Sequence, residues 1–168
     1  MGFERLLSKG ISLVRVIFMI TIGQLGMETR GYDETWAIVR SLTEAAKSEI
    51  RLYDIRQVID LSPSRELFNL YRKWVAEGYW NEDTFNTCYV PTFLRQLKHD
   101  KRAKDKLNEL YLKDKQGKKI LLLCYCKDEH ICHRSIIAGV LMGVGCNVVV
   151  ANKDNNYIIY DAMYRALK

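Results

Sequence analysis

The chain has little proline and no apolar run long enough to cross a membrane. Two prolines in 168 residues exclude long proline-rich linkers. The apolar stretch from Ile11 to Ile22 is too short for a bilayer span and contains Arg15. No small-residue cleavage site of a signal peptide follows it. We therefore expect a protein of the cytoplasm without membrane contact.

The sequence also lacks the spread of cysteines that a secreted disulfide framework shows. Five cysteines are present, and three of them fall between residues 124 and 132. This crowding favours reduced thiols in a cytosolic compartment. With 48% apolar and 27% charged residues, the composition is that of a globular protein and excludes a disordered or collagen-like chain. The length predicts a single domain over residues 1–168.

The net charge of +6 is concentrated in one segment. Residues 98–119 hold nine Lys or Arg against four Asp or Glu, a balance of +5, which leaves +1 for the remainder of the chain. Acids and bases are interleaved there at helical spacing, which is typical of a solvated helix face. The alternative is that this basic helix binds nucleic acid.

Buried strands alternate with helices along the chain. Runs rich in apolar and β-branched residues predict strands near 14–22, 50–60, 119–126 and 146–151. The alternation predicts an α/β fold: one three-layer domain whose mainly parallel, Rossmann-like sheet has about four strands. We expect the first and third of these strands to be neighbours. Ligands of such sheets bind beyond the carboxyl ends of the strands.

Polar residues suggest where several helices begin. Asp33 is expected to cap a helix over "ETWAIVRSLTEAAKS", and Ser64 and Asn81 are expected to cap two further helices. A longer helix is expected to open at Pro91, run past Tyr111 and end at Gly117.

The loop after the third strand concentrates the chemistry of the sequence. It brings Lys127, His133, Arg134 and Ser135 to a predicted helix start, where free N–H groups and the helix dipole favour an anion. Arginine adds a planar fork suited to phosphate. This interpretation predicts a pocket over residues 124–135 for a nucleotide or another phosphorylated small molecule.

Two other interpretations of the loop stay open, and the pocket interpretation has a catalytic variant. Cys124, Cys126, His130 and Cys132 are soft ligands that could hold zinc, although paired CxxC motifs are lacking. The cysteines could instead be small buried hydrophobes. Finally, Cys124, Cys132 or His133 could act on the ligand as nucleophile, acid or base, which would make the protein a hydrolase or transferase.

Two further groups of residues are candidates for the pocket. Asp54 and Arg56 would join it if their strand lies beside that of Cys124; the alternative is a local ion pair. The aromatic residues Trp74, Tyr79, Trp80, Phe85 and Tyr89 could stack on bases, although their spacing favours packing in the core or in a pocket wall.

The stretch "LLLCYCKDEHICHRSIIAGVL" resembles the C-terminal signature of the bacterial and phage family called domain of unknown function 488. Its apolar strand, Cys124, the acidic loop, and Cys132, His133 and Arg134 match in order. "LSPSRELFNLYRKW" is similar to the family's Ser-Pro-Ser helix start, and "YDIR" to its Asp-hydrophobic-Arg strand end. Position 126 is usually not a cysteine in the family.

The resemblance covers residues 50–142 and implies a compact α/β domain with a polar pocket near Cys-His-Arg. It also implies a link to nucleotide or nucleic-acid biology, often in phage or mobile elements, so that the host cytoplasm is the expected location of a phage-encoded member. The resemblance names no reaction.

Overall fold

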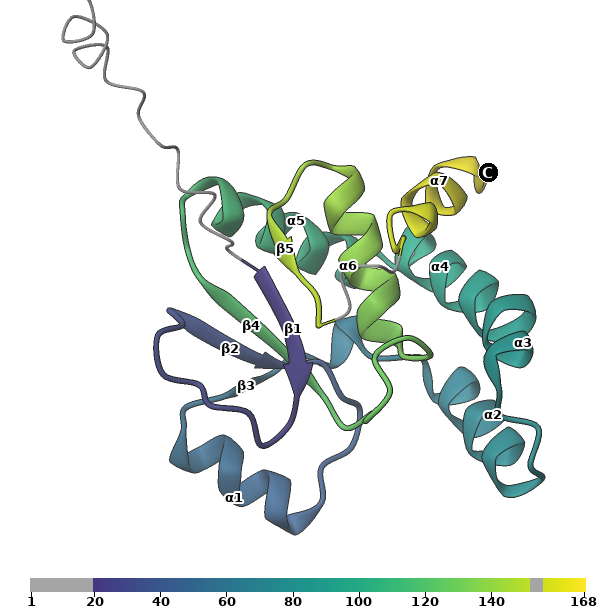
Figure 1. The fold of residues 1–168 in the computed structure, drawn as a ribbon, viewed down its shortest axis with the longest axis horizontal. Helices are drawn as coiled ribbons and strands as arrows, with labels where there is room; N and C mark the ends of the chain where they lie inside the picture. Colours follow the sequence, from purple (N-terminus) through teal and green to yellow (C-terminus); the bar gives the residue numbers. More distant parts are fainter. Residues whose placement is uncertain (1–19, 152–155) are drawn as a thin grey trace, which may run out of the picture.

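The computed structural model describes residues 20–151 and 156–168 (Figure 1). These residues contain five parallel strands in the order β3-β2-β4-β1-β5. The strands are β1 (Ile20–Gln24), β2 (Glu34–Ala37), β3 (Arg56–Gln57), β4 (Ile120–Cys124) and β5 (Val148–Val149). The α/β class and the three-layer, Rossmann-like architecture are confirmed, with one strand more than expected. Residues 14–19 of the first predicted strand lie outside the described residues.

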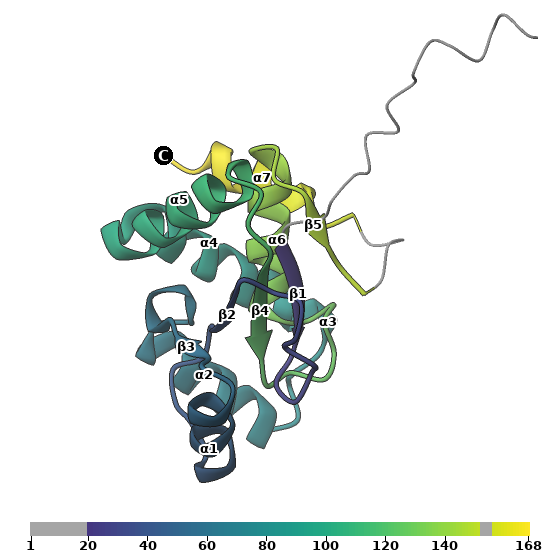
Figure 2. The same cartoon turned by 90° about the vertical axis from the view of Figure 1, so that its left-hand side faces the viewer.

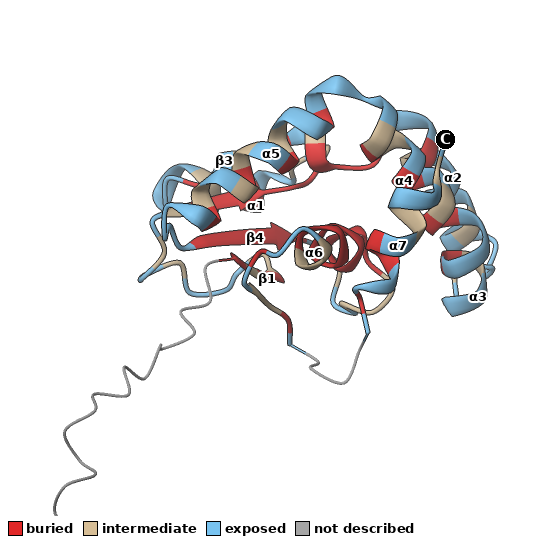
Figure 3. Cartoon of the chain, turned by 90° about the horizontal axis from the view of Figure 1, so that it is seen from above, coloured by how far each residue is buried: buried red, intermediate tan, exposed pale blue. Residues whose placement is uncertain are grey.

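Strand β4 is the centre of the sheet. It pairs with β1 and β2, and Figure 2 shows the three strands side by side. All its residues are buried, as Figure 3 shows, because a central parallel strand is covered on both faces. The predicted neighbours, β1 and β4, are confirmed. Cys124 pairs with Gln24, and Leu123 with Ala37, so β1, β2 and β4 end at one edge.

The helix expected after Asp33 is wrong over residues 34–43, because the helix of this region begins only at Glu44. Residues 34–37 form β2, whose pairing with β4 overrides the weak helical pattern. The helix α1 (Glu44–Leu52) starts later, at Thr43, whose hydroxyl accepts a hydrogen bond from the amide of Ala46 at 3.2 Å. Since α1 continues to Leu52, the strand expected near 50–60 is reduced to β3.

The connection from β3 to β4 contains a 3₁₀ turn, η1 (Ile59–Leu61), and most of the helices. Ser64 caps α2 (Arg65–Ala76) and Asn81 caps α3 (Glu82–Thr84), as predicted. A π-helical turn, η2 (Phe85–Tyr89), leads into α4 (Val90–His99), and α5 (Lys101–Lys115) follows.

The single helix expected from Pro91 past Tyr111 is wrong, because Asp100 divides it. The backbone of Asp100 is extended, and its carboxylate accepts from the amide of Arg102 at 2.8 Å, which starts α5 anew. Gly117, with a positive φ of 76°, follows the end of α5 as predicted.

Helix α6 (His133–Gly143) follows the cysteine-rich loop and packs against β1, β4, β5 and the closing helix α7 (Ile159–Ala166). Gly139 allows the close approach to α7. A Cβ atom at this position would lie 1.9 Å from the carbonyl oxygen of Tyr157, so a larger residue would displace the segment that enters α7. Among the described residues, no helix has the length and apolarity that a membrane span needs.

Candidate functional site

Four side chains meet where β4 ends and α6 begins. We call Cys124, Cys126, Cys132 and His133 the thiol cluster. The Sγ atom of Cys124 lies 3.7 Å from that of Cys126 and 3.7 Å from that of Cys132. The Nδ1 atom of His133 lies 3.8 Å from the sulfur atoms of Cys124 and Cys132. Strand β4 positions the first cysteine, and the start of α6 positions Cys132 and His133.

The second ring nitrogen of His133 is held by the sheet. Its Nε2 atom lies 2.7 Å from the carbonyl oxygen of Ile38, the residue after β2. The amide of Ile38 in turn donates to the carbonyl of Leu123 at 2.9 Å. A carbonyl oxygen only accepts, so Nε2 carries the proton in the neutral ring and Nδ1 presents a lone pair to the two sulfurs.

The pKa values within the thiol cluster diverge. Hydrogen bonds from Cys126 and Cys132 hold the pKa of Cys124 well below its ordinary value, with a smaller contribution from the charge of Arg134, against the effect of burial. The hydrogen bond to Cys124 raises the pKa of Cys126, and burial raises that of Cys132. Burial lowers the pKa of His133, which favours the neutral imidazole. Of the three thiols, that of Cys124 therefore loses its proton most readily.

The thiol cluster forms the floor of a cavity of about 210 Å³, which we call the aromatic cavity. It lies at the sheet edge where ligands of parallel α/β proteins bind. Its wall contains five aromatic side chains from α2, η2 and the loops: Phe68, Tyr71, Trp80, Tyr89 and Tyr125. The segment after β2 and Pro63 complete it, together with Ile131.

The aromatic wall is held by its own ring contacts. Trp80 meets Tyr71 edge to face at 4.7 Å between ring centroids and meets Tyr89 in the same way at 5.4 Å. Trp74 stacks behind Trp80 at 6.2 Å, and Phe85 is buried. Tyr79 is 62% exposed. Of the aromatic residues expected in a core or pocket wall, only Trp80 and Tyr89 line the cavity.

The predicted anion-binding residues are placed in different ways. Arg134 is buried; its Nη1 donates to the carbonyl of Gly23 at 2.5 Å and its Nη2 to that of Lys127 at 3.5 Å. It is thus directed at β1 and is not among the residues that line the cavity. The Ser135 hydroxyl donates to the carbonyl of Cys132 at 2.7 Å, and the side chain of Lys127 is exposed.

His130, Asp54 and Arg56 lie apart from the thiol cluster. The Nε2 atom of His130 lies 3.0 Å from the Glu82 carboxylate, so this histidine links the loop to α3. Asp54 is an exposed turn residue with a φ of 52°. The guanidinium of Arg56 pairs with Glu109 of α5 at 2.9 Å. The structure brings neither Asp54 nor Arg56 to the cavity.

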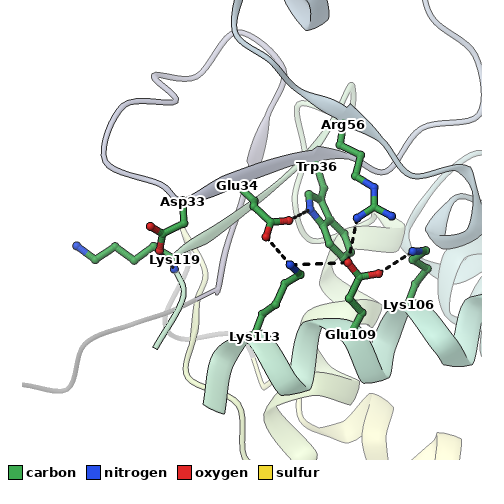
Figure 4. Close-up of polar contacts among 8 residues, drawn as sticks. All are labelled: Asp33, Glu34, Trp36, Arg56, Lys106, Glu109, Lys113 and Lys119. Atoms are coloured by element: carbon green, nitrogen blue, oxygen red, sulfur yellow. Dashed lines mark hydrogen bonds and ion pairs between the residues drawn. The ribbon is translucent and has the colours of Figure 1, made fainter. Parts of the chain in front are cut away.

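Arg56 belongs to a second polar group, which we call the Trp36 network (Figure 4). Glu34 accepts from the indole of Trp36 at 2.9 Å and pairs with Lys113. Glu109 pairs with Lys106 and lies near Lys113. Opposite charges on β2, β3 and α5 are thus joined across the buried indole, and part of the basic segment 98–119 is neutralised within the fold.

Several cavity residues were missed by sequence reasoning. Val39, Arg40 and Ser41 line the cavity because they follow β2, which was interpreted as a helix. The signal that could have found them is Thr43 followed by Glu44, a better helix start than Asp33. Nothing in the local pattern marked Phe68, Tyr71 or Tyr125, since their shared wall depends on how α2 and the loops pack.

Comparison with protein families relates most of the chain to a known family. A family model described as "DUF488-N3a: Active DUF488-N3 subclade" matches residues 20–144, which include the sheet strands β1 to β4, the aromatic wall and the thiol cluster. No curated protein and no solved structure matches the chain.

Proposed function

Because the chain belongs to the DUF488 family, by the match to its N3a subclade, we propose that it binds a nucleotide or another phosphorylated small molecule with a planar ring in the aromatic cavity. The observation that carries the proposal is the composition of the cavity. Aromatic rings form its wall, a cation lies at its edge, and the start of a helix lies at its floor. A planar anionic ligand is the class that suits these features.

The wall supports the planar part of the ligand. Tyr71 and Trp80 project from different segments, and their edge-to-face contact fixes both rings. Stacking of a base on an aromatic side chain contributes about 1–3 kcal/mol, largely independent of which base it is. Burial of an apolar ring adds to this, because the cavity surface is mostly apolar.

Two features support the anionic part. Arg40 lines the cavity, and its Nε donates to the carbonyl of Pro63 at 2.7 Å, which fixes the guanidinium at the edge. The start of α6 at Cys132 and His133 also faces the cavity, and the first turn of a helix favours negative charge. A phosphate between them would be attracted from both sides.

A second candidate function is turnover of the same ligand by a hydrolase or transferase. Two observations favour it: the matched subclade is described as active, and Cys124, Cys132 and His133 line the cavity floor. These side chains would meet the part of the ligand that reaches the floor. Binding and turnover therefore use one site and differ in whether the ligand leaves unchanged.

The test is a panel of nucleotides that includes cyclic and ADP-ribose-type compounds, measured by calorimetry and by chromatography of the recovered ligand. At least one compound should bind, and Tyr71→Leu should weaken its binding about tenfold, equal to about 1.4 kcal/mol. Tyr79→Leu, which changes an exposed tyrosine outside the cavity, is the matched control and should bind normally.

The outcomes separate the two candidates. Recovery of the unchanged ligand supports the binding function, and a product formed by the wild type supports turnover. Equal affinity of the Tyr71 and Tyr79 variants would place the ligand outside the aromatic cavity and overturn the proposal.

A further inference from the structure

The thiol cluster has the dimensions of a metal site. Among the described residues, the ligand atoms of Cys124, Cys132 and His133 form one group that all lie within 4.8 Å of one another. In a tetrahedral zinc site with Zn–S bonds of about 2.3 Å and Zn–N bonds of about 2.0–2.1 Å, two sulfurs are about 3.8 Å apart and a sulfur and a nitrogen about 3.6 Å apart. The distances of 3.7 Å between the sulfurs and 3.8 Å from each sulfur to the imidazole nitrogen are close to both values.

We infer that Cys124, Cys132 and His133 bind a divalent transition-metal ion, with zinc as the ion that suits two thiolates and one imidazole. This inference goes beyond the proposed ligand binding and does not depend on the class of that ligand. It also changes the ligand set that the sequence suggested, since His133 takes the place that His130 was expected to have.

The orientation of His133 is the strongest support. A ligating histidine usually donates its other ring N–H to a backbone carbonyl or a carboxylate, which fixes the ring and the tautomer. The Nε2 contact with Ile38 at 2.7 Å has this form and leaves Nδ1 toward the sulfurs. Because the amide of Ile38 is bonded to Leu123 of β4, the ring is positioned by the same sheet that positions Cys124.

The fourth coordination position should face the aromatic cavity. All three ligands line the cavity, so a fourth ligand would reach the metal from there. Three protein ligands with one open position are the arrangement of catalytic rather than structural zinc sites. Cys126 lies beside Cys124 but outside the group of mutually close ligand atoms, so we assign it no metal bond.

The first experiment needs no substitution. Full-length wild-type protein is stripped with a chelator under reducing conditions and titrated with Zn²⁺ or Co²⁺, with bound metal measured by elemental analysis and cobalt coordination by visible absorption. We expect about one equivalent of metal per chain and a tetrahedral thiolate spectrum. Binding of less than about 0.2 equivalents at micromolar zinc would overturn the inference, because thiolate sites hold zinc tightly.

Matched variants then test the ligand set. His133→Ala should weaken metal binding at least 100-fold, whereas His130→Ala, at the histidine of the loop before α6, should leave one equivalent bound. Cys132→Ser should behave like His133→Ala, and Cys88→Ser, at an exposed cysteine elsewhere, should behave like the wild type. Loss of metal in His130→Ala would contradict the assignment of His133.

Cys126→Ser tests the open position. It should retain one equivalent of metal, and loss of binding would overturn the three-ligand site in favour of a closed one. Should a ligand variant fail to fold by circular dichroism, the wild-type titration still decides whether a metal binds. Nucleotide binding by the stripped protein is measured separately, so failure of the metal inference is distinguishable from failure of the proposed function.

Discussion

The thiol cluster and the Trp36 network are two polar groups built on the same central sheet, and they are satisfied in opposite ways. In the network, the carboxylates of Glu34 and Glu109 are each paired with cations of α5 or β3. In the thiol cluster, three sulfurs and a ring nitrogen face one another, without opposite charges between them. Each carboxylate of the network has a cation as partner. The thiol cluster instead directs several electron-pair donors toward one point.

The two groups also differ in where they lie in the fold. The network lies between the strands and α5 around a fully buried indole, and the cluster lies at the carboxyl edge beneath a cavity. Paired charges at a packed interface join elements of the fold, whereas converging electron-pair donors at an open edge remain accessible to a ligand. The comparison predicts that changes in the network alter stability and that changes around the cluster alter binding.

The largest expected effect is on stability, at Trp36. Its side chain is fully buried, so Trp36→Ala should lower the free energy of unfolding by about 3–5 kcal/mol. Tyr79→Ala, at an exposed ring, should change it by less than about 0.5 kcal/mol. Urea unfolding followed by circular dichroism measures both. If the folded Trp36 variant bound less metal per chain, the prediction that the Trp36 network affects only stability would be wrong.

The second prediction concerns Arg134, for which the sequence suggested a role in ligand binding and the structure suggests a role in stability. Because its guanidinium is buried on the carbonyls of Gly23 and Lys127, Arg134→Gln should lower the free energy of unfolding by about 2 kcal/mol, the scale of hydrogen bonds from a charged group. Ligand affinity of the folded fraction should be unchanged. Reduced affinity at an unchanged melting temperature would return Arg134 to the ligand, as the sequence suggested.

The sequence predicted the class of fold and marked the loop where the thiol cluster lies. The apolar run of β4, the crowded cysteines and the helix start at His133 are local signals, and together they drew attention to this loop. They could not show which histidine joins the cluster, because that depends on the carbonyl of Ile38, far away in the sequence. Nor could they separate Arg134, which faces β1, from its neighbour His133.

The errors in the fold have a common physical origin. Strand β2 has only four residues, too few for their periodicity to outweigh the helical pattern around them. The strand expected near 50–60 was too long, because α1 continues to Leu52 and only the two residues of β3 pair. Both strands exist because neighbouring strands offer hydrogen bonds. The break between α4 and α5 depends on a single residue, Asp100, which caps α5 within a long stretch of polar residues and is therefore hard to recognise in the sequence. Arg40 was missed as a consequence of the error at β2.

The third prediction tests whether charge near the cavity acts locally. Arg40→Gln should weaken binding of a phosphorylated ligand by about 1.5 kcal/mol, or roughly tenfold, because it removes a charged donor at the cavity edge. Lys104→Gln, which removes the same charge from the exposed face of α5, should have no effect on this affinity. Calorimetry of both variants gives the answer.

Equal losses from Arg40→Gln and Lys104→Gln, both with a steep dependence on salt, would contradict a local site. They would favour the alternative that the basic segment 98–119 attracts nucleic acid through a diffuse field.

The smallest effect belongs to the Trp36 network and depends on pH. Burial raises the pKa of Glu109, but the hydrogen bonds and charges of Lys106 and Arg56 outweigh it, so the pKa lies below its ordinary value in the folded protein. A carboxyl with a lowered folded pKa stabilises the fold above its unfolded pKa of about 4.3, and this contribution is lost as the pH falls through the lowered folded value.

At pH 7, Glu109→Gln should therefore lower the free energy of unfolding by about 0.5–1 kcal/mol, the range for partly exposed ion pairs. The difference between variant and wild type should shrink as the pH is lowered below the ordinary carboxyl pKa, because the wild-type side chain then becomes neutral as well. Urea unfolding at pH 7 and at a series of lower pH values measures the difference. Glu44→Gln, which removes the more exposed ion pair of Glu44 with Lys47 on α1, is the comparison outside the network and should give a smaller difference. A difference that stays constant over this range would mean that Glu109 acts through packing and not through its charge.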